Sequence, residues 1–318
     1  MWIMAAGGRS NAGDYSAAAE RFIPRELAGL RLDQALARLF PEHSRSRLQA
    51  WVRAGRVLLD ARPAADVKRK VWGGERVALA DAAGAVESAE LPEAIPLAVV
   101  HEDDAIIVID KPAGLVVHPG AGNRQGTLLN ALLHHAPQLA SVPRAGIVHR
   151  LDKETSGLLV VAKTLAAHTD LVRQLAARTV QREYLALVHG RVAGDGTIDA
   201  PIGRHPVART RMAVTASGRE ARTRYRVSER FDGATLLAVT LETGRTHQIR
   251  VHMRAIGHPL VGDPTYGKRR SASGTLADFP RQALHATRLG LAHPVTRARC
   301  EWESPLPADL RELIAKLR

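Results

Sequence analysis

The amino-acid sequence predicts an α+β protein, in which a small basic domain precedes a larger domain built on a mixed, largely antiparallel sheet with flanking helices. Strand-like and helix-like segments follow one another without the strict alternation that a doubly wound sheet requires. The charge of the chain reverses near residue 81, where a basic segment gives way to an acidic one. The chain has neither the glycine-rich fingerprint of a dinucleotide site nor a P-loop, which favours the α+β class.

The composition is that of a folded, basic protein. Its 318 residues are 45% hydrophobic, and 45 Lys and Arg against 32 Asp and Glu give a net charge of +13. This excess predicts a polyanionic partner, with nucleic acid ahead of a membrane, because no apolar run approaches the roughly 20 residues of a spanning helix. Cys300 is the only cysteine, which excludes an intramolecular disulfide and a cysteine-based zinc cluster and suits a reducing cytoplasm.

The small domain is predicted over residues 24–80, after a tail at 1–23 that is rich in Gly, Ala, Ser and Asn and that we expect to be disordered. Apolar residues at helical spacing predict a helix within Leu30–Phe40. A second short helix is expected to follow Ser44 and to end at Gly55. Short alternating runs after it predict a small sheet.

Positive charge is concentrated in this small domain, which has 12 basic and 6 acidic residues. Arg45 and Arg47 open the second helix, where their charge combines with free backbone amides and favours a phosphate. We therefore expect both side chains to bind RNA. The alternative is an ordinary solvated helix face, because basic helix surfaces are common in soluble proteins.

An acidic linker is predicted at 81–95, because this segment contains Pro and Ala and lacks Lys and Arg. The large domain is expected at 96–318. It begins with two predicted strands, Leu97–Val100 and Ile106–Ile109, around an acidic turn. Leucines at helical spacing then predict a helix at Thr127–His135.

The most informative stretch is Ala145–Thr164, in which a polar cluster separates two apolar segments, Ile147–Val148 and Gly157–Ala162. The pattern predicts a strand, a polar loop and a buried strand, and such strands would make the loop rigid. Asp152 in this loop is the leading candidate for a reactive group. An aspartate three residues before Thr155 also makes ordinary turn hydrogen bonds, and spacing alone does not separate the two interpretations.

A helix is predicted at Leu165–Arg178, and three later strands complete the predicted sheet. The strands are expected at 181–190, Arg222–Val227 and Leu236–Leu241. Tyr184 lies near the start of the first of them. On residue type alone, a core aromatic ring with a satisfied hydroxyl is the better interpretation of this tyrosine.

A last motif, LETGRTHQIR, predicts a helix that Thr246 caps. Its apolar stripe consists of Ile249, Met253 and Ile256. His247 and Arg250 fall on another face, and Arg245 comes just before the helix, on the loop that follows a strand. A structural helix with a basic solvent face would show the same pattern.

These motifs carry a resemblance to a known family. HRLDKETSGLL, at His149–Leu159, resembles the active-site signature of the RluA-type pseudouridine synthases, and DKPAGLVVHPG, REYLALV and GRTHQIR resemble further blocks of that family. Residues 24–80 resemble an S4 RNA-binding domain. The resemblance covers residues 25–318 and implies a pseudouridine synthase fold with a central cleft. It also implies an enzyme that isomerises uridine in RNA and needs no cofactor or metal ion.

The same resemblance implies three catalytic residues. Asp152 matches the catalytic aspartate, which acts either as a nucleophile at the sugar or as a base on a sugar proton. Tyr184 matches an active-site tyrosine that stacks on the flipped uracil. Arg245 matches an arginine that pairs with the aspartate, and we expect it to keep Asp152 ionised and oriented.

RNA contacts are expected at three more positions. The resemblance implies that Arg150 takes the place of the uridine that flips out of the RNA. His247 and Arg250 are weaker candidates for phosphate contacts. The implied substrate is large-subunit ribosomal RNA, and we expect a cytoplasmic monomer that binds no membrane.

Two other functions compete with this interpretation. One is a non-catalytic ribosome-assembly factor that binds ribosomal RNA, and the joint presence of Asp152, Tyr184 and Arg245 argues against it. The other is a hydrolase that cleaves free nucleosides, which has no use for a basic accessory domain.

Overall fold

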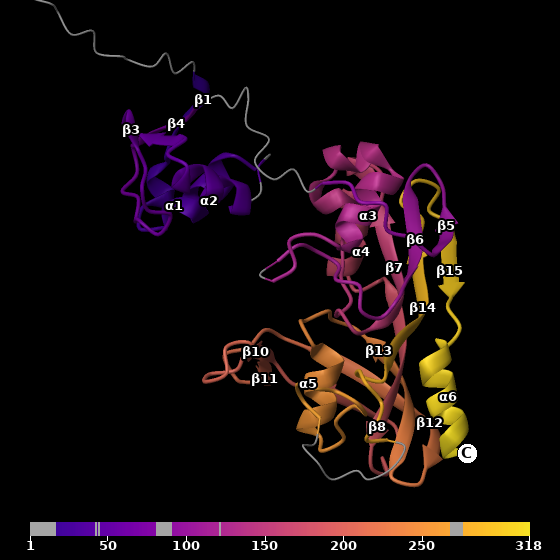
Figure 1. Ribbon diagram of the computed structural model, residues 1–318. Helices are drawn as coiled ribbons and strands as arrows, with labels where there is room; N and C mark the ends of the chain where they lie inside the picture. Colours follow the sequence, from indigo (N-terminus) through magenta and orange to yellow (C-terminus); the bar gives the residue numbers. More distant parts are fainter. Residues whose placement is uncertain (1–16, 42, 44, 81–90, 121, 268–275) are drawn as a thin grey trace, which may run out of the picture. The chain divides into compact units, whose positions relative to one another are not determined.

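The computed structural model describes residues 17–41, 43, 45–80, 91–120, 122–267 and 276–318 (Figure 1). Contacts divide the chain into two compact units, Met1–Glu87 and Ser88–Arg318. Within the described ranges, no helix combines the length and the apolar character that crossing a membrane requires.

The N-terminal unit packs two helices against a small antiparallel sheet whose strand order is β1-β4-β2-β3. Its helical elements are η1 (Arg25–Leu27), α1 (Leu32–Leu39) and α2 (Arg45–Arg53). Its strands are β1 (Ala17–Phe22), β2 (Val57–Leu59), β3 (Arg62–Pro63) and β4 (Arg76–Ala80). The apolar side chains of α1 that recur at helical spacing enter its core with those of α2, β2 and β4.

Strand β1 corrects the predicted tail, because it lies inside the segment 1–23 that we expected to be disordered. Its backbone pairs with β4, with Phe22 opposite Arg76, and the next residue, Ile23, is buried. A strand formed by backbone pairing needs little apolar sequence of its own, which is why composition gave no signal for it. Residues 1–16, Ser44 and the linker residues 81–90 lie outside the described residues.

The C-terminal unit is built on a nine-stranded sheet in the order β5-β6-β7-β14-β8-β13-β12-β9, with β15 added on β14. The strands before the sheet centre are β5 (Val99–Glu102), β6 (Ile106–Lys111) and β7 (Ser156–Ala162). Those beyond it are β8 (Gln181–His189), β9 (Gly196–Asp199), β12 (Arg222–Phe231) and β13 (Ala234–Leu241). The C-terminal strands are β14 (Leu284–Ala292) and β15 (Arg299–Glu303).

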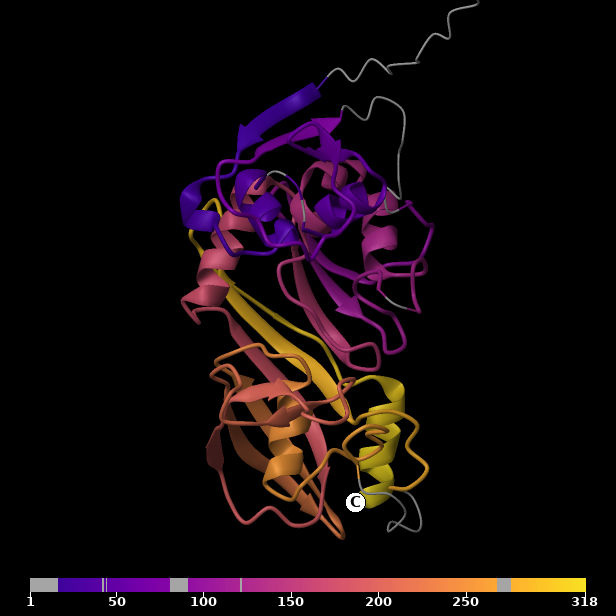
Figure 2. The same ribbon diagram turned by 90° about the vertical axis from the view of Figure 1, so that its left-hand side faces the viewer.

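Antiparallel pairs make up this sheet except where β7 meets β14. The predicted mixed, largely antiparallel sheet is therefore confirmed. A separate hairpin consists of β10 (Ile202–Arg204) and β11 (Met212–Val214). Figure 2 shows β14 running from the half of the unit that contains β6 and β7 into the half that contains β12 and β13.

Helices cover both faces of the sheet, so its central strands are buried on both sides. Along β6, Ile107 and Ile109 join the core with α3 (Leu128–His135) and α5 (Gln248–Ala255). Ile106 and Val108 instead face α4 (Leu165–Ala176). The C-terminal helix α6 (Ala308–Leu317) packs on Leu187 and Leu236.

The centre of the sheet determines where the polar loop before β7 ends. Gly157 has a φ of +110°, and a Cβ there would lie 2.2 Å from the carbonyl oxygen of Ala286 on β14. Only glycine permits this approach. Across the next strand pair, Ala286 lies opposite Tyr184 on β8. The loop that contains Asp152 is thereby placed beside Tyr184.

The other end of that loop differs from the prediction, because Ile147–Val148 do not form a strand. The short 3-10 helices η2 (Pro137–Ser141) and η3 (Pro143–Gly146) precede them, and Arg144 and Ala145 have φ values of 55° and 49°. This left-handed turn leaves Ile147 with a single bridge to Val161. The two apolar residues pack in the structure, but the turn before them removes the extended backbone that a strand needs.

Candidate active site

Tertiary contacts fix the backbone of the loop from His149 to Ser156 on both sides of Asp152. Arg281 donates to the carbonyl oxygen of Glu154 at 3.1 Å, and Gln282 donates to the hydroxyl of Thr155 at 3.2 Å. His149 accepts the N–H of Val160 at 3.1 Å. Burial and the nearby charge of Arg182 lower the pKa of His149 to about 3, so this imidazole is neutral and can accept.

A fully buried lysine, Lys111, ties this loop to the DKPAGLVVHPG segment. Its Nζ donates to the carbonyl oxygens of Pro112, Leu115 and Lys153 at 2.7, 3.0 and 3.0 Å. An ammonium group has three donors, so this set uses all of them. Burial lowers the pKa of Lys111 to about 7, against the opposing effect of the Glu154 and Asp152 carboxylates.

We expect Lys111→Met to lower the free energy of unfolding by about 1–3 kcal/mol at pH 7, because it leaves buried carbonyls without their donor. The folded pKa of about 7 lies below the ordinary value of 10.5, so the unfolded chain binds the extra proton between these pH values. The free energy of unfolding of the wild-type protein should therefore increase relative to that of Lys111→Met as pH rises from 7 towards 10. Urea unfolding at pH 7, 8 and 9 measures both free energies, and the same pH dependence for the two proteins would contradict this expectation.

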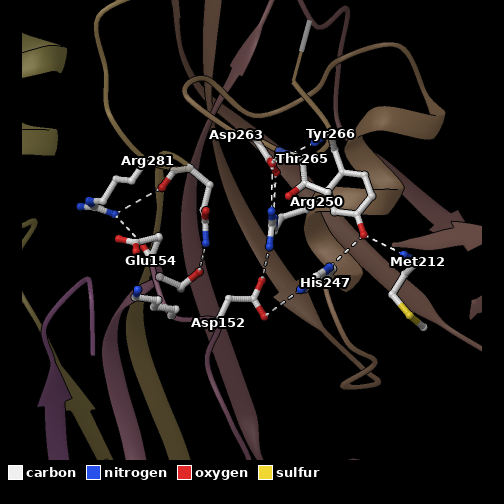
Figure 3. A network of polar contacts seen from close by, with 12 residues as sticks. Asp152, Glu154, Met212, His247, Arg250, Asp263, Thr265, Tyr266 and Arg281 are labelled. Atoms are coloured by element: carbon white, nitrogen blue, oxygen red, sulfur yellow. Dashed lines mark hydrogen bonds and ion pairs between the residues drawn. The ribbon is translucent and has the colours of Figure 1, made fainter. Parts of the chain in front are cut away.

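The carboxylate of Asp152 is paired with Arg250 (Figure 3). The Nη1 of Arg250 lies 2.9 Å from Asp152 Oδ2, while its Nε and Nη2 bind both carboxylate oxygens of Asp263 at 2.7 and 2.9 Å. Asp263 is completely buried and also accepts the backbone N–H groups of Thr265 and Tyr266. Burial opposes the charge of Arg250, but the two carboxylates outweigh it and raise the pKa of Arg250.

The second oxygen of Asp152 is left without a hydrogen bond to any described residue. The Nε2 of His247 lies 3.9 Å from this Oδ1, which is too long for a hydrogen bond. Asp152 is 16% exposed. One oxygen is therefore fixed by Arg250, whereas the other is left unbonded, and the residue lines the cleft described below.

Hydrogen bonds determine which nitrogen of His247 carries the proton. The hydroxyl of Tyr266 accepts the backbone N–H of Met212 at 2.9 Å and lies 2.8 Å from His247 Nδ1, to which it can donate its own proton. Burial lowers the pKa of His247 despite the nearby charge of Asp152, which favours the neutral ring. The proton of that ring then sits on Nε2, facing Asp152.

The predicted partner of Asp152 is wrong: the structure places Arg250 there, and not Arg245. The helix begins at Gln248 rather than at the predicted cap Thr246, because His247 adopts a left-handed conformation with φ of 57°. This turn directs Arg250 into the buried ion pair. Arg245 remains before the turn, where its Nε donates to the carbonyl oxygen of Glu220 at 2.9 Å.

The same geometry corrects two predicted phosphate contacts. The side chain of Arg250 is 6% exposed, and each of its three guanidinium nitrogens already binds Asp152 or Asp263, so its burial and these ion pairs leave it poorly placed for a phosphate. His247 is bonded to Tyr266 on one side and faces Asp152 on the other. Both residues therefore belong to the surroundings of the carboxylate.

Asp152 lines a cleft of about 540 Å³. Asp152 is the only acidic residue among the described residues that line it, whereas the arginines of the lining are Arg144, Arg150, Arg182 and Arg245. Arg150 is exposed, as an RNA-contacting side chain must be. Ordinary glycosidases use two carboxylates, and the described lining of this cleft has no second acid for such a mechanism.

Tyr184 lies in the wall of the same cleft and is 6% exposed. Burial raises the pKa of its hydroxyl, and within the described part of the chain this hydroxyl has no hydrogen-bond partner. The alternative interpretation, a core tyrosine with a satisfied hydroxyl, requires a hydrogen-bond partner for this group. The predicted neighbourhood of Asp152 and Tyr184 is thus present in the structure.

The two arginines predicted to bind RNA in the N-terminal unit differ in what the structure describes. Arg45 binds the buried carboxylate of Asp33 at 2.8 Å, together with Arg31 and Gln49, and its side chain is 46% exposed. Arg45 therefore orients the start of α2 and still presents part of its guanidinium to solvent. The side chain of Arg47 lies outside the described part of the structure.

Sequence reasoning missed several residues that complete this site. Gln248 is buried, and it binds Thr243 and the backbone N–H of Arg245 at 2.8 and 2.9 Å. Asp263 and Tyr266 lie in the block LVGDPTYG, which also resembles the family, but neither residue was assigned a role from the sequence. No group of three or more His, Cys, Asp or Glu side chains in the described ranges is arranged to hold a metal ion.

Comparison with known proteins places this cleft in a class of RNA-modifying enzymes. The family model for RNA pseudouridylate synthases matches residues 105–255, and the S4 domain model matches residues 30–77. The first range contains Asp152, Tyr184 and Arg250, and the second contains α1, α2 and β2. The class that this fold and site define is therefore that of the RNA-modifying isomerases.

Curated relatives are more specific. The chain is 59% identical over 302 residues to the ribosomal large subunit pseudouridine synthase D of Nitrosomonas europaea, which covers 94% of this chain and 88% of that protein. It is 56% identical to the protein of the same name from Pseudomonas aeruginosa, over 93% of this chain and 94% of the relative. The chain belongs to the RNA pseudouridylate synthase family, and it is a pseudouridine synthase.

Solved structures agree with this assignment. The human RNA pseudouridylate synthase domain containing 1 superposes with a TM-score of 0.54 and 30% identity, covering 69% of this chain and 86% of that one. The human domain containing 4 has a TM-score of 0.55, 25% identity and coverage of 69% and 92%. The predicted family, enzyme class and fold, with an S4 domain in front of the catalytic domain, are confirmed.

Proposed function

We propose that this enzyme converts uridines of large-subunit ribosomal RNA to pseudouridine, with Asp152 as the reacting carboxylate. The observation that carries the proposal is Asp152 itself, which lines a cleft with no second acid among its described lining residues and whose Oδ1 makes no hydrogen bond to a described residue. The names of the curated relatives support the choice of RNA. The net charge of +13 supports a polyanionic substrate.

The reaction needs one carboxylate. The bond between N1 of the uracil and C1′ of the ribose breaks, the base turns, and C5 bonds to C1′ while its hydrogen leaves to solvent and N1 gains one. Asp152 acts either by attacking C1′ or by removing a sugar proton, and both routes require an unbonded carboxylate oxygen. Arg250 orients that oxygen by binding the other one.

The uridine must leave its helix to reach Asp152, at a cost of a few kcal/mol. Arg150 is exposed at the cleft, and we infer that its guanidinium fills the vacated position and stacks on the neighbouring bases. Tyr184 offers its ring face to the flipped uracil. Arg245 also lines the cleft, and with its expected pairing taken over by Arg250 we assign it to the RNA backbone.

A second basic hollow supports an extended RNA contact. It has a volume of about 720 Å³, lies between β11 and α5, and is lined by Arg211, Arg254 and Tyr266 among others. Because Tyr266 also binds His247, this hollow adjoins the surroundings of Asp152. We infer that the flanking RNA strand passes here, and that the S4 domain adds affinity through Arg45 and Arg47. We also infer a monomer, because one chain supplies every assigned residue, and a cytoplasmic location without membrane binding, because the proposed substrate is ribosomal RNA.

Release of tritium from RNA labelled at C5 of uridine tests the proposal. The wild-type protein should release tritium from an unmodified large-subunit ribosomal RNA transcript. It should release none from free C5-labelled uridine, which has no flanking strand to bind. Release from free uridine but not from RNA would contradict the proposed substrate.

We infer that the hydroxyl of Tyr184 assists the loss of the proton from C5, so Tyr184→Phe should lower the rate of tritium release by about 100-fold with RNA affinity unchanged, because it removes the hydroxyl and keeps the ring. Tyr184→Ala should weaken RNA binding as well. Tyr225→Phe, the same change on β12, which β13 separates from β8, is the matched control and should leave the rate unchanged. A wild-type rate for Tyr184→Phe would limit Tyr184 to stacking.

A further inference from the structure

Arg182 is a second buried arginine at the cleft. It lies on β8 two residues before Tyr184, so both side chains point to the same face of the sheet. Arg182 is only 7% exposed and lines the cleft that contains Asp152. It therefore belongs to the deep part of the cleft, whereas Arg144 and Arg150 are exposed.

The guanidinium of Arg182 has no partner among the described residues. Its side chain makes no hydrogen bond or ion pair with any of them, and its Nε is a fully buried polar atom without an acceptor. The other buried arginines near the loop are satisfied, since Arg250 binds Asp152 and Asp263 and Arg281 binds Asp309. An unpaired buried charge is costly, so a structure that retains one has a use for it.

Gly244 leaves space for the guanidinium of Arg182, and the charge of Arg182 acts on Tyr184. A Cβ on Gly244 would lie 2.8 Å from Arg182 Nη1, so a larger residue would displace the side chain. The charge of Arg182 contributes, after burial, to the lowered pKa of His149, and it opposes the rise that burial imposes on the pKa of Tyr184. Its field thus reaches the ring that lies beside the flipped base.

We propose that Arg182 binds a carbonyl oxygen of the flipped uracil and stabilises the negative charge that the base acquires when its bond to the ribose breaks. This inference rests on the proposed function. The depth of Arg182 favours the base over a phosphate, because the flipped base enters the cleft ahead of the backbone. The exposed Arg144 and Arg150 are better placed for phosphates.

The electron balance of the reaction explains the need for such a group. When the N1–C1′ bond breaks, its electron pair stays on the uracil and is shared among N1, O2 and O4. Asp152 takes up the change on the sugar side, by bonding to C1′ or by accepting a sugar proton. The uracil anion keeps its charge until C5 bonds to C1′, after which C5 loses its proton and N1 gains one. Arg182 is the unpaired cation available to it.

The first test compares Arg182→Met with wild type in single-turnover tritium release from the C5-labelled ribosomal RNA transcript. We expect a rate lower by about 100-fold or more, with the dissociation constant for RNA within about twofold, because the contact strengthens in the transition state. Arg226→Met, at an exposed position of β12, is the matched control and should leave both values unchanged. Arg182→Lys keeps a charge without the planar fork and should recover part of the rate, which no purely structural role predicts if thermal stability is equal.

The second test changes the substrate at the target uridine to 2-thiouridine or 4-thiouridine, because sulfur accepts hydrogen bonds poorly. For the oxygen that Arg182 binds, the thio substrate should slow the wild-type enzyme but not slow Arg182→Met any further. Equal slowing of both proteins by both substrates would overturn the assignment. A raised dissociation constant with a smaller salt dependence would instead indicate a phosphate contact and would also overturn it. Wild-type protein that releases no tritium would contradict the proposed function itself.

Discussion

Replacing Asp152 by Asn should lower tritium release from the ribosomal RNA transcript by about 10⁴-fold or more, because the amide neither attacks C1′ nor accepts a sugar proton. The fold should survive, since Arg250 keeps both of its bonds to Asp263. RNA affinity should stay within a few-fold of wild type. Single-turnover tritium release, thermal unfolding and RNA binding of the same preparations measure the three quantities.

The matched control for this substitution is Glu183→Gln, which makes the same chemical change next to Tyr184. Glu183 alternates with Tyr184 along β8 and therefore points to the opposite face of the sheet. It should retain the wild-type rate. Turnover by Asp152→Asn within about tenfold of wild type would show that another group performs the chemistry.

The second large effect is expected for Arg250→Met, which leaves two carboxylates without their cation. Asp263 is completely buried, so its unpaired charge should lower the free energy of unfolding by about 3–5 kcal/mol. Tritium release should fall as well, because Asp152 loses the bond that orients it. Urea unfolding and single-turnover kinetics measure the two losses separately.

A double variant separates these two roles of Arg250. Arg250→Met combined with Asp263→Leu removes both buried charges, so it should regain much of the stability while the activity stays low. If the double variant is as unstable as Arg250→Met alone, the cost does not come from an unpaired Asp263. If it regains activity, Asp152 does not need Arg250.

Much of the fold follows from local sequence. The continuous apolar run of β6 and the helical spacing in α1 and α3 are properties of short segments, and the burial of these apolar side chains confirms them. Asp152 and Tyr184 were found because each lies in a contiguous motif. Strand β1 was missed because its signal is the backbone of β4, and not its own side chains.

The choice between Arg245 and Arg250 shows where local reasoning fails. Both arginines lie in GRTHQIR, and which one meets Asp152 depends on the residue at which α5 begins. The left-handed conformation of His247 moves that point to Gln248. Histidine tolerates positive φ better than most residues, but nothing in its neighbours announces the turn.

The partners of the site are separated along the chain, and only the fold brings them together. Arg250 meets Asp152 across 98 residues, and Lys111 meets the carbonyl of Lys153 across 42. The missing partner of Arg182 is likewise a property of the folded interior. Sequence supplied the reacting carboxylate, whereas its orientation and the cation proposed for the uracil required the structure.

The most direct measurement is a nucleoside analysis of unmodified large-subunit ribosomal RNA after incubation with the wild-type protein and with Asp152→Asn. Digestion and chromatography separate uridine, pseudouridine and free uracil. We expect wild type to form one pseudouridine for each uridine lost, with no free uracil, and Asp152→Asn to form none. Free uracil in place of pseudouridine, or equal pseudouridine with both proteins, would contradict isomerisation by Asp152.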